Sequence, residues 1–233
     1  MNRQPLDNHE DILDIFDPEQ KQWLASQYST TFPDGNGGRL HLLLGDSIAR
    51  DAQVSVATPD LLLNRTRGGD SWKRLCHRVA QELEDWHCAA SGYGVTTGHV
   101  AIWMTGNDLY PDGDPERRRR QLATLKDNMT VVLDAVLESC PVVEIIGPLP
   151  RLRHDIGRAW EQCPAFHGER MSLAHFGGRV THWLVGRALT TYKKKRHVVG
   201  GRSSRFYTGD GVHLSEEGYE RLLSRLPEWL QRP

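Results

Sequence analysis

One short stretch carries most of the information about the fold: Leu40-His41-Leu42-Leu43-Leu44-Gly45-Asp46-Ser47. Its apolar half has the length of a buried strand, and its Gly-Asp-Ser end is typical of a turn from a strand into a helix. A serine at such a turn is a candidate nucleophile, but its hydroxyl needs a positioned base, and the base needs an orienting acid. Both residue types occur near the other end of the chain, in Asp210-Gly211-Val212-His213.

The composition favours a single intracellular domain. A chain of 233 residues with a formal net charge of −1 has room for one α/β core and has no overall attraction to nucleic acid or membrane. The four cysteines contain no Cys-x-x-Cys pair, which favours reduced thiols. The start of the chain lacks the apolar segment of a secretory signal, and no later stretch reaches the length of a membrane span. We therefore expect a cytoplasmic protein.

The chain divides into two parts. Residues 1–38 are rich in acidic residues and end in a run of Gly and Pro, so we interpret them as an N-terminal extension or linker. Residues 39–233 form the predicted catalytic domain, in which short apolar runs alternate with helical patterns. This alternation is typical of a parallel sheet with helices on both faces.

Periodicity places the elements of this domain. The predicted strands are 40–44, 61–64, 100–104 and 142–146, and the predicted helices are 71–86, 116–139 and one after Ser215. Ser215 can cap the last helix, because a serine side chain accepts a hydrogen bond from the first turn. Pro227 is expected to end or kink that helix.

The residues that follow the predicted strands can supply the parts of an acyl-transfer site. Ligands of open parallel sheets bind beyond the carboxyl ends of the strands. Ser47 would be the nucleophile, His213 the general base and then the acid, and Asp210 the group that orients the imidazole. The backbone amides of Ser47 and Gly69 and the side-chain amide of Asn107 would donate hydrogen bonds to the oxyanion.

Four sequence blocks, in this order, resemble those of the SGNH hydrolase family, also called the GDSL esterase/lipase family. They are Gly45-Asp46-Ser47-Ile48, Gly69, Asn107-Asp108, and the pair Asp210 and His213. The third block departs from the common Gly-x-Asn-Asp pattern, because Thr105 stands where the glycine is usual and Gly106 follows it. The resemblance covers about residues 39 to 230. It implies a three-layer α/β/α, flavodoxin-like fold with a central parallel sheet, and ester hydrolysis without a metal or an organic cofactor.

Simpler interpretations exist for several of these residues. Ser47 by itself could be only a helix cap, Gly69 could be only a turn glycine with Gly68 as the donor, and Asn107-Asp108 could form only an Asx-turn. Asp108 is expected to be structural rather than catalytic. Three histidines near Cys163 match no zinc-binding spacing, so we expect no metal site there; they are His154, His167 and His175.

Two basic clusters remain. The run Arg117–Arg120 lies at the start of a predicted helix and is interpreted as a solvated face. The second cluster is predicted to be a mobile loop ahead of Asp210, and its members are Lys193, Lys194, Lys195, Arg196, Arg202 and Arg205. A solvated loop is the simplest interpretation, but such a loop could also attract an anionic substrate, anionic lipid headgroups or nucleic acid.

Three functions are compatible with these observations. The leading one is a serine esterase that hydrolyses acyl or acetyl esters of a small molecule or lipid. The second is an esterase domain of a retrotransposon-type, nucleic-acid-associated protein, since some mobile-element proteins resemble this family. The third is a catalytically silent SGNH module retained for binding, and the intact Ser47, Asp210 and His213 argue against it.

Overall fold

A computed structural model describes residues 38–110 and 115–230. Its central element is a sheet of five strands: β1 (Arg39–Gly45), β2 (Leu61–Thr66), β3 (Thr96–Trp103), β4 (Val143–Ile146) and β5 (Val180–Trp183). The strands lie in the order β2-β1-β3-β4-β5, and every neighbouring pair is parallel. The predicted parallel sheet is confirmed, and so are its four predicted strands. β5, at the edge of the sheet, was not predicted.

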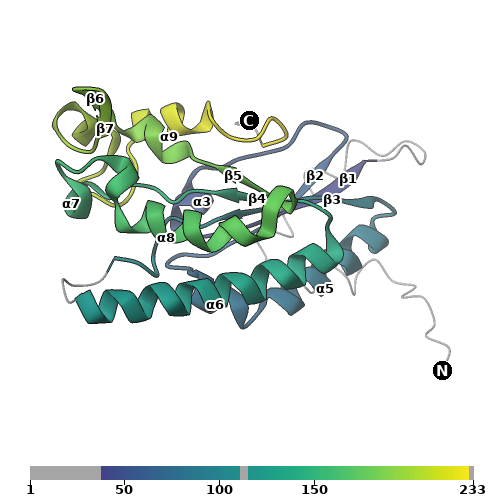
Figure 1. The fold of residues 1–233 in the computed structure, drawn as a ribbon. Coiled ribbons are helices and arrows are strands. Elements are labelled where there is room, and N and C mark those ends of the chain that lie inside the picture. Colours follow the sequence, from purple (N-terminus) through teal and green to yellow (C-terminus); the bar gives the residue numbers. More distant parts are fainter. Residues whose placement is uncertain (1–37, 111–114, 231–233) are drawn as a thin grey trace.

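Helices cover both faces of this sheet, which gives the expected three layers (Figure 1). One face packs against α4 (Trp72–Cys76), α5 (Val79–Gly92), α6 (Pro115–Ser139) and α8 (Pro164–Leu173). The other packs against α3 (Ser47–Asp51), α9 (Glu216–Leu223) and the 3-10 helices η3 (Val185–Leu189) and η4 (Gly201–Phe206). The remaining described helices are short: α7 (Leu152–Asp155), η1 (Trp160–Gln162) and η2 (Ala174–Arg179).

β1 is buried on both faces, and its side chains contribute to the hydrophobic cores on both sides of the sheet. Leu40, Leu42 and Leu44 point into the core beneath α4, α5 and α6, whereas Leu43 points into the core beneath α3 and α9. All four are essentially inaccessible to solvent. A parallel strand buried on both faces is apolar along its length, which explains the leucine run that the sequence shows there.

Two predicted helix boundaries were wrong. The segment 71–86 is not one helix but α4 followed by α5, with a break at His77 and Arg78, where the Arg78 side chain turns back to bind Asp70. The last helix, α9, is capped by Ser215 as predicted but ends at Leu223 and does not reach Pro227. A proline restricts the residue before it and has no N–H, so a helix commonly ends upstream of it.

The second basic cluster is folded, and the expectation of a mobile loop was wrong. β6 (Thr191–Lys193) and β7 (Arg196–Val198) form an antiparallel hairpin. Lys194 and Lys195 make the connecting turn with φ angles of 46° and 67°. Such a turn needs two residues with positive φ. The cluster continues into η4, where Arg205 forms an ion pair of 3.0 Å with Glu217.

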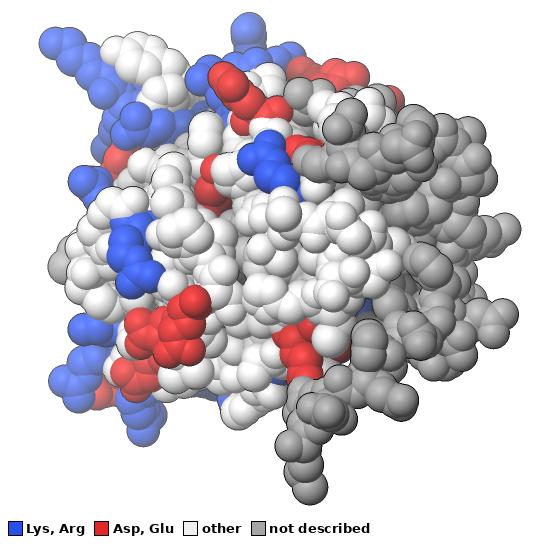
Figure 2. All heavy atoms as spheres, turned by 90° about the vertical axis from the view of Figure 1, so that its right-hand side faces the viewer, with Lys and Arg blue, Asp and Glu red and all other residues white. Residues whose placement is uncertain are grey.

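The predicted extension, residues 1–38, lies outside the described residues except for Gly38. Among the described helices, none combines the length and the apolar character needed to cross a bilayer. Figure 2 shows the face that lies on the right-hand side of Figure 1. Its described part is mostly uncharged at the centre, with basic side chains gathered toward the upper left and acidic side chains in small separate groups.

Candidate active site

The three residues predicted as nucleophile, base and acid lie in one hydrogen-bonded chain. The Oγ atom of Ser47 is 3.1 Å from Nε2 of His213, and Nδ1 of His213 is 2.6 Å from Oδ2 of Asp210. Ser47 follows β1, whereas Asp210 and His213 lie between η4 and α9, 166 positions later in the case of the histidine. The fold therefore brings the two ends of the domain together at the carboxyl end of the sheet.

The turn after β1 holds Ser47 in place. A Cβ atom at Gly45 would lie 2.6 Å from the Cβ of Ala49 and 2.8 Å from the carbonyl oxygen of Trp103, so only glycine fits there. The next residue, Asp46, is fully buried and caps α3 by accepting a hydrogen bond from the Ile48 amide. Ser47 is thus the first residue of the helix, where its own amide has no intrahelical acceptor.

The loop of Asp210 and His213 is equally constrained. Oδ1 of Asp210 accepts hydrogen bonds from the amides of Val212 and His213, at 2.8 and 2.9 Å, and from the hydroxyl of Thr208, at 2.9 Å. The bond from the His213 ring, together with these donors, holds the pKa of Asp210 well below its usual range. Asp210 is therefore a carboxylate with one oxygen kept for the imidazole.

This arrangement fixes the tautomer of the neutral imidazole. A carboxylate can only accept hydrogen bonds, so Nδ1 of His213 carries the proton that Asp210 accepts. Nε2 then presents its lone pair to the hydroxyl of Ser47. The serine proton therefore has an acceptor at hydrogen-bond distance, which is the requirement for general-base catalysis.

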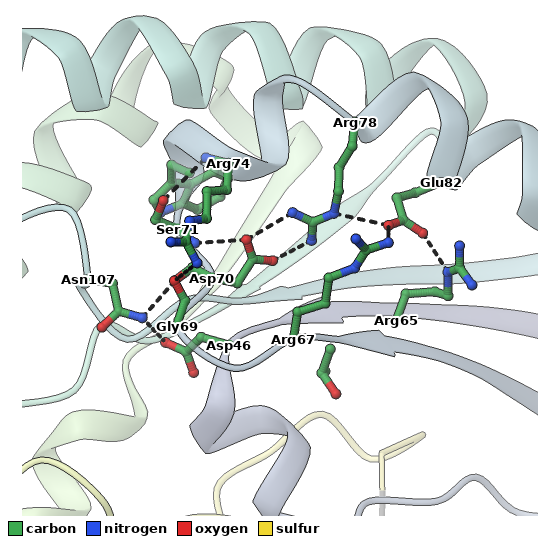
Figure 3. Close-up of polar contacts among 12 residues, drawn as sticks. Asp46, Arg65, Arg67, Gly69, Asp70, Ser71, Arg74, Arg78, Glu82 and Asn107 are labelled. Atoms are coloured by element: carbon green, nitrogen blue, oxygen red, sulfur yellow. Dashed lines mark hydrogen bonds and ion pairs between the residues drawn. The ribbon is translucent and has the colours of Figure 1, made fainter. Parts of the chain in front are cut away.

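Gly69 lies in the turn after β2 that the sequence indicated. Its φ angle is +66°, a conformation that favours glycine. Its carbonyl oxygen accepts a hydrogen bond of 3.0 Å from Arg74, and no described residue accepts one from its amide (Figure 3). The Gly69 amide is therefore available to a ligand.

Asn107, in the loop after β3, lies beside the same turn. Its Nδ2 atom donates to the carbonyl oxygen of Asp70 at 2.6 Å and lies 3.5 Å from Oδ2 of Asp46 (Figure 3). The structure thus brings Asn107 next to the neighbours of both Gly69 and Ser47. Its side chain binds other segments of the chain, which differs from the local Asx-turn considered as the simpler interpretation.

No protein-family model and no curated protein matches the sequence. Solved structures do match its fold. A GDSL-like lipase from Bacteroides thetaiotaomicron is 12% identical, with 88% of this chain and 93% of that chain covered and a TM-score of 0.54. TesA is 16% identical, with 80% and 95% covered and a TM-score of 0.55. A Bacteroides fragilis protein with the provisional description of an acylhydrolase is 15% identical, with 90% and 95% covered and a TM-score of 0.55.

The chain has the fold of the SGNH hydrolases. Its departure from their common Gly-x-Asn-Asp pattern has a visible consequence. Thr105, which stands in the usual glycine position, donates both its amide and its hydroxyl to Oδ2 of Asp46. The loop of Asn107 is therefore tied directly to the turn of Ser47. Burial raises the pKa of Asp46, and the bonds from Thr105 and Ile48 partly oppose that shift.

Within this SGNH fold, Asp108 is structural, as expected from the sequence. Its carboxylate accepts hydrogen bonds from the amides of Trp72, at 3.0 Å, and Lys73, at 3.2 Å, which are the first residues of α4. Negative charge at this end of a helix is favourable, because the first amides lack intrahelical partners. Asp108 therefore joins the Asn107 loop to the helix that follows the Gly69 turn.

A buried ion-pair network supports the Gly69 turn, and the sequence did not reveal it. Arg78 binds both carboxylate oxygens of Asp70 and also contacts Glu82 at 3.0 Å. Arg65 and Arg67 bind Glu82 at 2.6 and 2.7 Å (Figure 3). Glu82 is only 1% exposed, so three arginines compensate a carboxylate that would be costly to bury alone. The network connects α5 to the turn of the candidate oxyanion site.

No group of three or more potential metal ligands occurs within residues 38–110 and 115–230. Two of the three histidines near Cys163 have aromatic neighbours. The His154 ring lies 5.1 Å from that of Tyr110, and the His175 ring lies 4.0 Å from that of Phe176. Burial raises the pKa of the Cys163 thiol, so it is not an activated nucleophile.

Proposed function

We propose that this protein is an SGNH-type serine hydrolase that cleaves carboxylic esters, either acyl or acetyl esters. The observation that carries the proposal is the continuous hydrogen-bonded chain from Ser47 through His213 to Asp210, at the carboxyl end of a parallel sheet. The fold that this chain shares with a GDSL-like lipase supports the reaction class. The amide of Gly69, from which no described residue accepts a hydrogen bond, supplies one donor for an oxyanion. Asn107 donates to the carbonyl oxygen of Asp70 at 2.6 Å and can supply a second donor through its other N–H group, whose contact with Asp46 is long, at 3.5 Å.

The first half of the reaction forms an acyl-enzyme. Oγ of Ser47 attacks the ester carbonyl carbon while Nε2 of His213 takes the serine proton. The carbonyl oxygen becomes an oxyanion that the amides of Ser47 and Gly69 and Nδ2 of Asn107 stabilise. The carbon–oxygen bond to the leaving group then breaks, and the imidazolium returns its proton to the departing alcohol. Asp210 stabilises the imidazolium charge throughout.

The second half regenerates the enzyme. A water molecule attacks the acyl-enzyme carbonyl, and Nε2 of His213 takes the water proton. The second tetrahedral intermediate collapses with release of the carboxylic acid, and His213 protonates Oγ of Ser47. All proton transfers pass through Nε2 of His213, which is already at hydrogen-bond distance from Oγ of Ser47.

The rate is expected to rise with pH, because a general base must be unprotonated to act. Only the neutral imidazole can accept the serine proton, and the depressed pKa of Asp210 keeps this carboxylate ionised across the same range. The measurement is kcat/KM for a short p-nitrophenyl ester between about pH 5 and about pH 8, which reports on the free enzyme. A profile that is flat over this range, or falls with pH, would contradict the role of His213.

The substrate class is tested by a series of p-nitrophenyl esters of increasing acyl length together with acetylated sugars. Hydrolysis of at least one series member by the purified full chain supports the proposal. A folded protein that hydrolyses none of them overturns it.

The basic hairpin favours a second property, binding to single-stranded nucleic acid. We propose this because four consecutive basic residues, Lys193 to Arg196, surround an exposed turn, and none of them has a carboxylate partner within the described residues. Such a cluster can contact phosphates without reading the sequence. The hairpin precedes the Asp210 loop, with only η4 between them.

Replacing these four residues by Gln should weaken binding to a fluorescent single-stranded oligonucleotide. The negative salt slope, d log K/d log [salt], should become shallower by about 3, because four phosphate contacts are lost. The measurement is fluorescence anisotropy at several salt concentrations. A matched control replaces Arg117–Arg120, an equal number of charges in α6, by Gln. Equal losses in both variants, or no salt-dependent binding by the wild type, would refute the assignment.

A further inference from the structure

The side-chain amide of Asn107 is held at both of its ends. Its nitrogen donates to the carbonyl oxygen of Asp70, and its oxygen accepts a hydrogen bond from the guanidinium group of Arg151. Asp70 is itself held by Arg78 (Figure 3). An exposed asparagine normally rotates about its last torsion, which would exchange the donor and acceptor ends of the amide. Here the carbonyl oxygen of Asp70, which can only accept, and the guanidinium group of Arg151, which can only donate, both require the same orientation of the amide.

Arg151 is in turn fixed by the loop that follows β4. The carbon atom of its guanidinium group lies 4.6 Å from the centroid of the Tyr110 ring, in a cation–π contact. Its backbone amide donates to Oδ2 of Asp155 at 3.0 Å, and the Tyr110 hydroxyl donates to the same oxygen at 2.5 Å. Asp155 is fully buried, so it holds both the ring of Tyr110 and the backbone of Arg151 in place. The guanidinium group therefore has a defined position beside Asn107.

The charge of Arg151 is directed at a neutral amide. Within the described residues it has no carboxylate at ion-pair distance, although Asp46, Asp155 and Asp210 lie near enough to stabilise its charge. A hydrogen bond from a cation is stronger than one between neutral groups, and it polarises the acceptor. Polarisation of the Asn107 oxygen makes the N–H groups of the same amide better donors. Arg151 can thus both orient and strengthen the proposed oxyanion donor.

We propose that Arg151 is a positioning residue, which together with the Asp70 carbonyl fixes the Asn107 amide so that its second N–H group, at 3.5 Å from Asp46, can donate to the oxyanion. This inference rests on the proposed esterase function. Arg151 acts through Asn107 and contacts neither Ser47 nor His213 by any described bond. Its contribution should therefore exist only while Asn107 is present.

The kinetic test compares four variants on a neutral p-nitrophenyl ester: Arg151→Met, Asn107→Ala, the double variant, and the control Arg153→Met. Loss of one oxyanion donor costs about 10²-fold to 10³-fold in kcat, so we expect Arg151→Met to lose about 10-fold to 10²-fold with little change in KM. The double variant should be no slower than Asn107→Ala. Arg153 is exposed on α7, and its guanidinium group makes no described hydrogen bond or ion pair, so its variant should match the wild type.

Three kinetic outcomes would overturn the assignment: a loss no larger than that of Arg153→Met, a rise in KM at constant kcat, or full additivity with Asn107→Ala. Thermal unfolding of each variant separates a folding defect from a catalytic one. If Arg151→Met does not fold, Arg151→Lys takes its place, since lysine keeps the charge and loses the planar fork.

A second measurement is independent of activity. The side-chain NH₂ signals of Asn107 in ¹⁵N-labelled protein, assigned by their absence in Asn107→Ala, should show a rigid group with an order parameter of about 0.85. In Arg151→Met the order parameter should fall below about 0.6, and in Arg153→Met it should not change. A mobile Asn107 amide in the wild type would refute the inference even if the esterase proposal holds. A rigid Asn107 amide in a protein without esterase activity would support the positioning by Arg151 and refute the proposed function.

Discussion

Replacement of Ser47 by alanine should abolish ester hydrolysis, with kcat falling by at least about 10⁴-fold. Among the described residues, the hydroxyl of Ser47 is the only group at hydrogen-bond distance from Nε2 of His213, so no other side chain is placed to replace it as the nucleophile. The fold should be unaffected. Asp46, not Ser47, caps α3, and alanine is favourable at the first position of a helix.

The measurement is hydrolysis of the best p-nitrophenyl ester by wild type, Ser47→Ala and the control Ser91→Ala. Ser91 is exposed near the end of α5, and its side chain makes no described hydrogen bond. The control should keep wild-type activity, and all three proteins should unfold at similar temperatures. Appreciable turnover by folded Ser47→Ala would place the reaction at another group and refute the proposed mechanism.

The features predicted correctly are those with a local cause. The leucine run of β1 is apolar because both faces of the strand are buried, and that demand can be read from the sequence. Ser215 caps α9 through a bond to the Gly218 amide, which involves only neighbouring residues. The contact between Asp210 and His213 also has a local cause, because one loop supplies both the amides and the imidazole that bind the carboxylate, while the catalytic roles of the two residues stay predictions.

The features that were missed depend on tertiary structure. β5 has few apolar residues because it is a short, partly exposed edge strand that the rest of the sheet stabilises. The hairpin of β6 and β7 has Lys194 and Lys195 in a turn where Asn-Gly would have been recognisable. The break between α4 and α5 accompanies the ion pair of Arg78 with Asp70. None of these features has a periodic or compositional signal.

The support of the candidate site was missed for the same reason. The contact of Arg151 with Asn107 joins residues 44 positions apart, and that of Asp108 with Trp72 joins residues 36 positions apart. A single sequence gives no signal that two such distant positions are in contact. The blocks could therefore indicate which groups would react, whereas only the structure shows which groups hold them in place.

Replacement of Asp210 by asparagine should lower kcat by about 10⁴-fold, because it should reverse the tautomer of His213. Oδ1 of Asp210 accepts three hydrogen bonds, from two amides and the Thr208 hydroxyl. These donors fix the orientation of the carboxylate. An asparagine oxygen is required at that position, since its NH₂ group cannot accept these bonds. The NH₂ group must then face Nδ1 of His213 and donate to it. Nε2 would carry the proton and could no longer accept one from Ser47.

This reversal can be observed directly, by measuring kcat and the ¹⁵N chemical shifts of the His213 ring in Asp210→Asn. The shifts should move from an Nδ1–H to an Nε2–H pattern while the unfolding temperature stays close to that of the wild type, because the three bonds to the oxygen are retained. Asp134→Asn, an exposed position in α6, is the control for the loss of one negative charge. A kcat within about tenfold of the wild type would show that Asp210 does not direct the imidazole, and the proposed triad would then lack its acid.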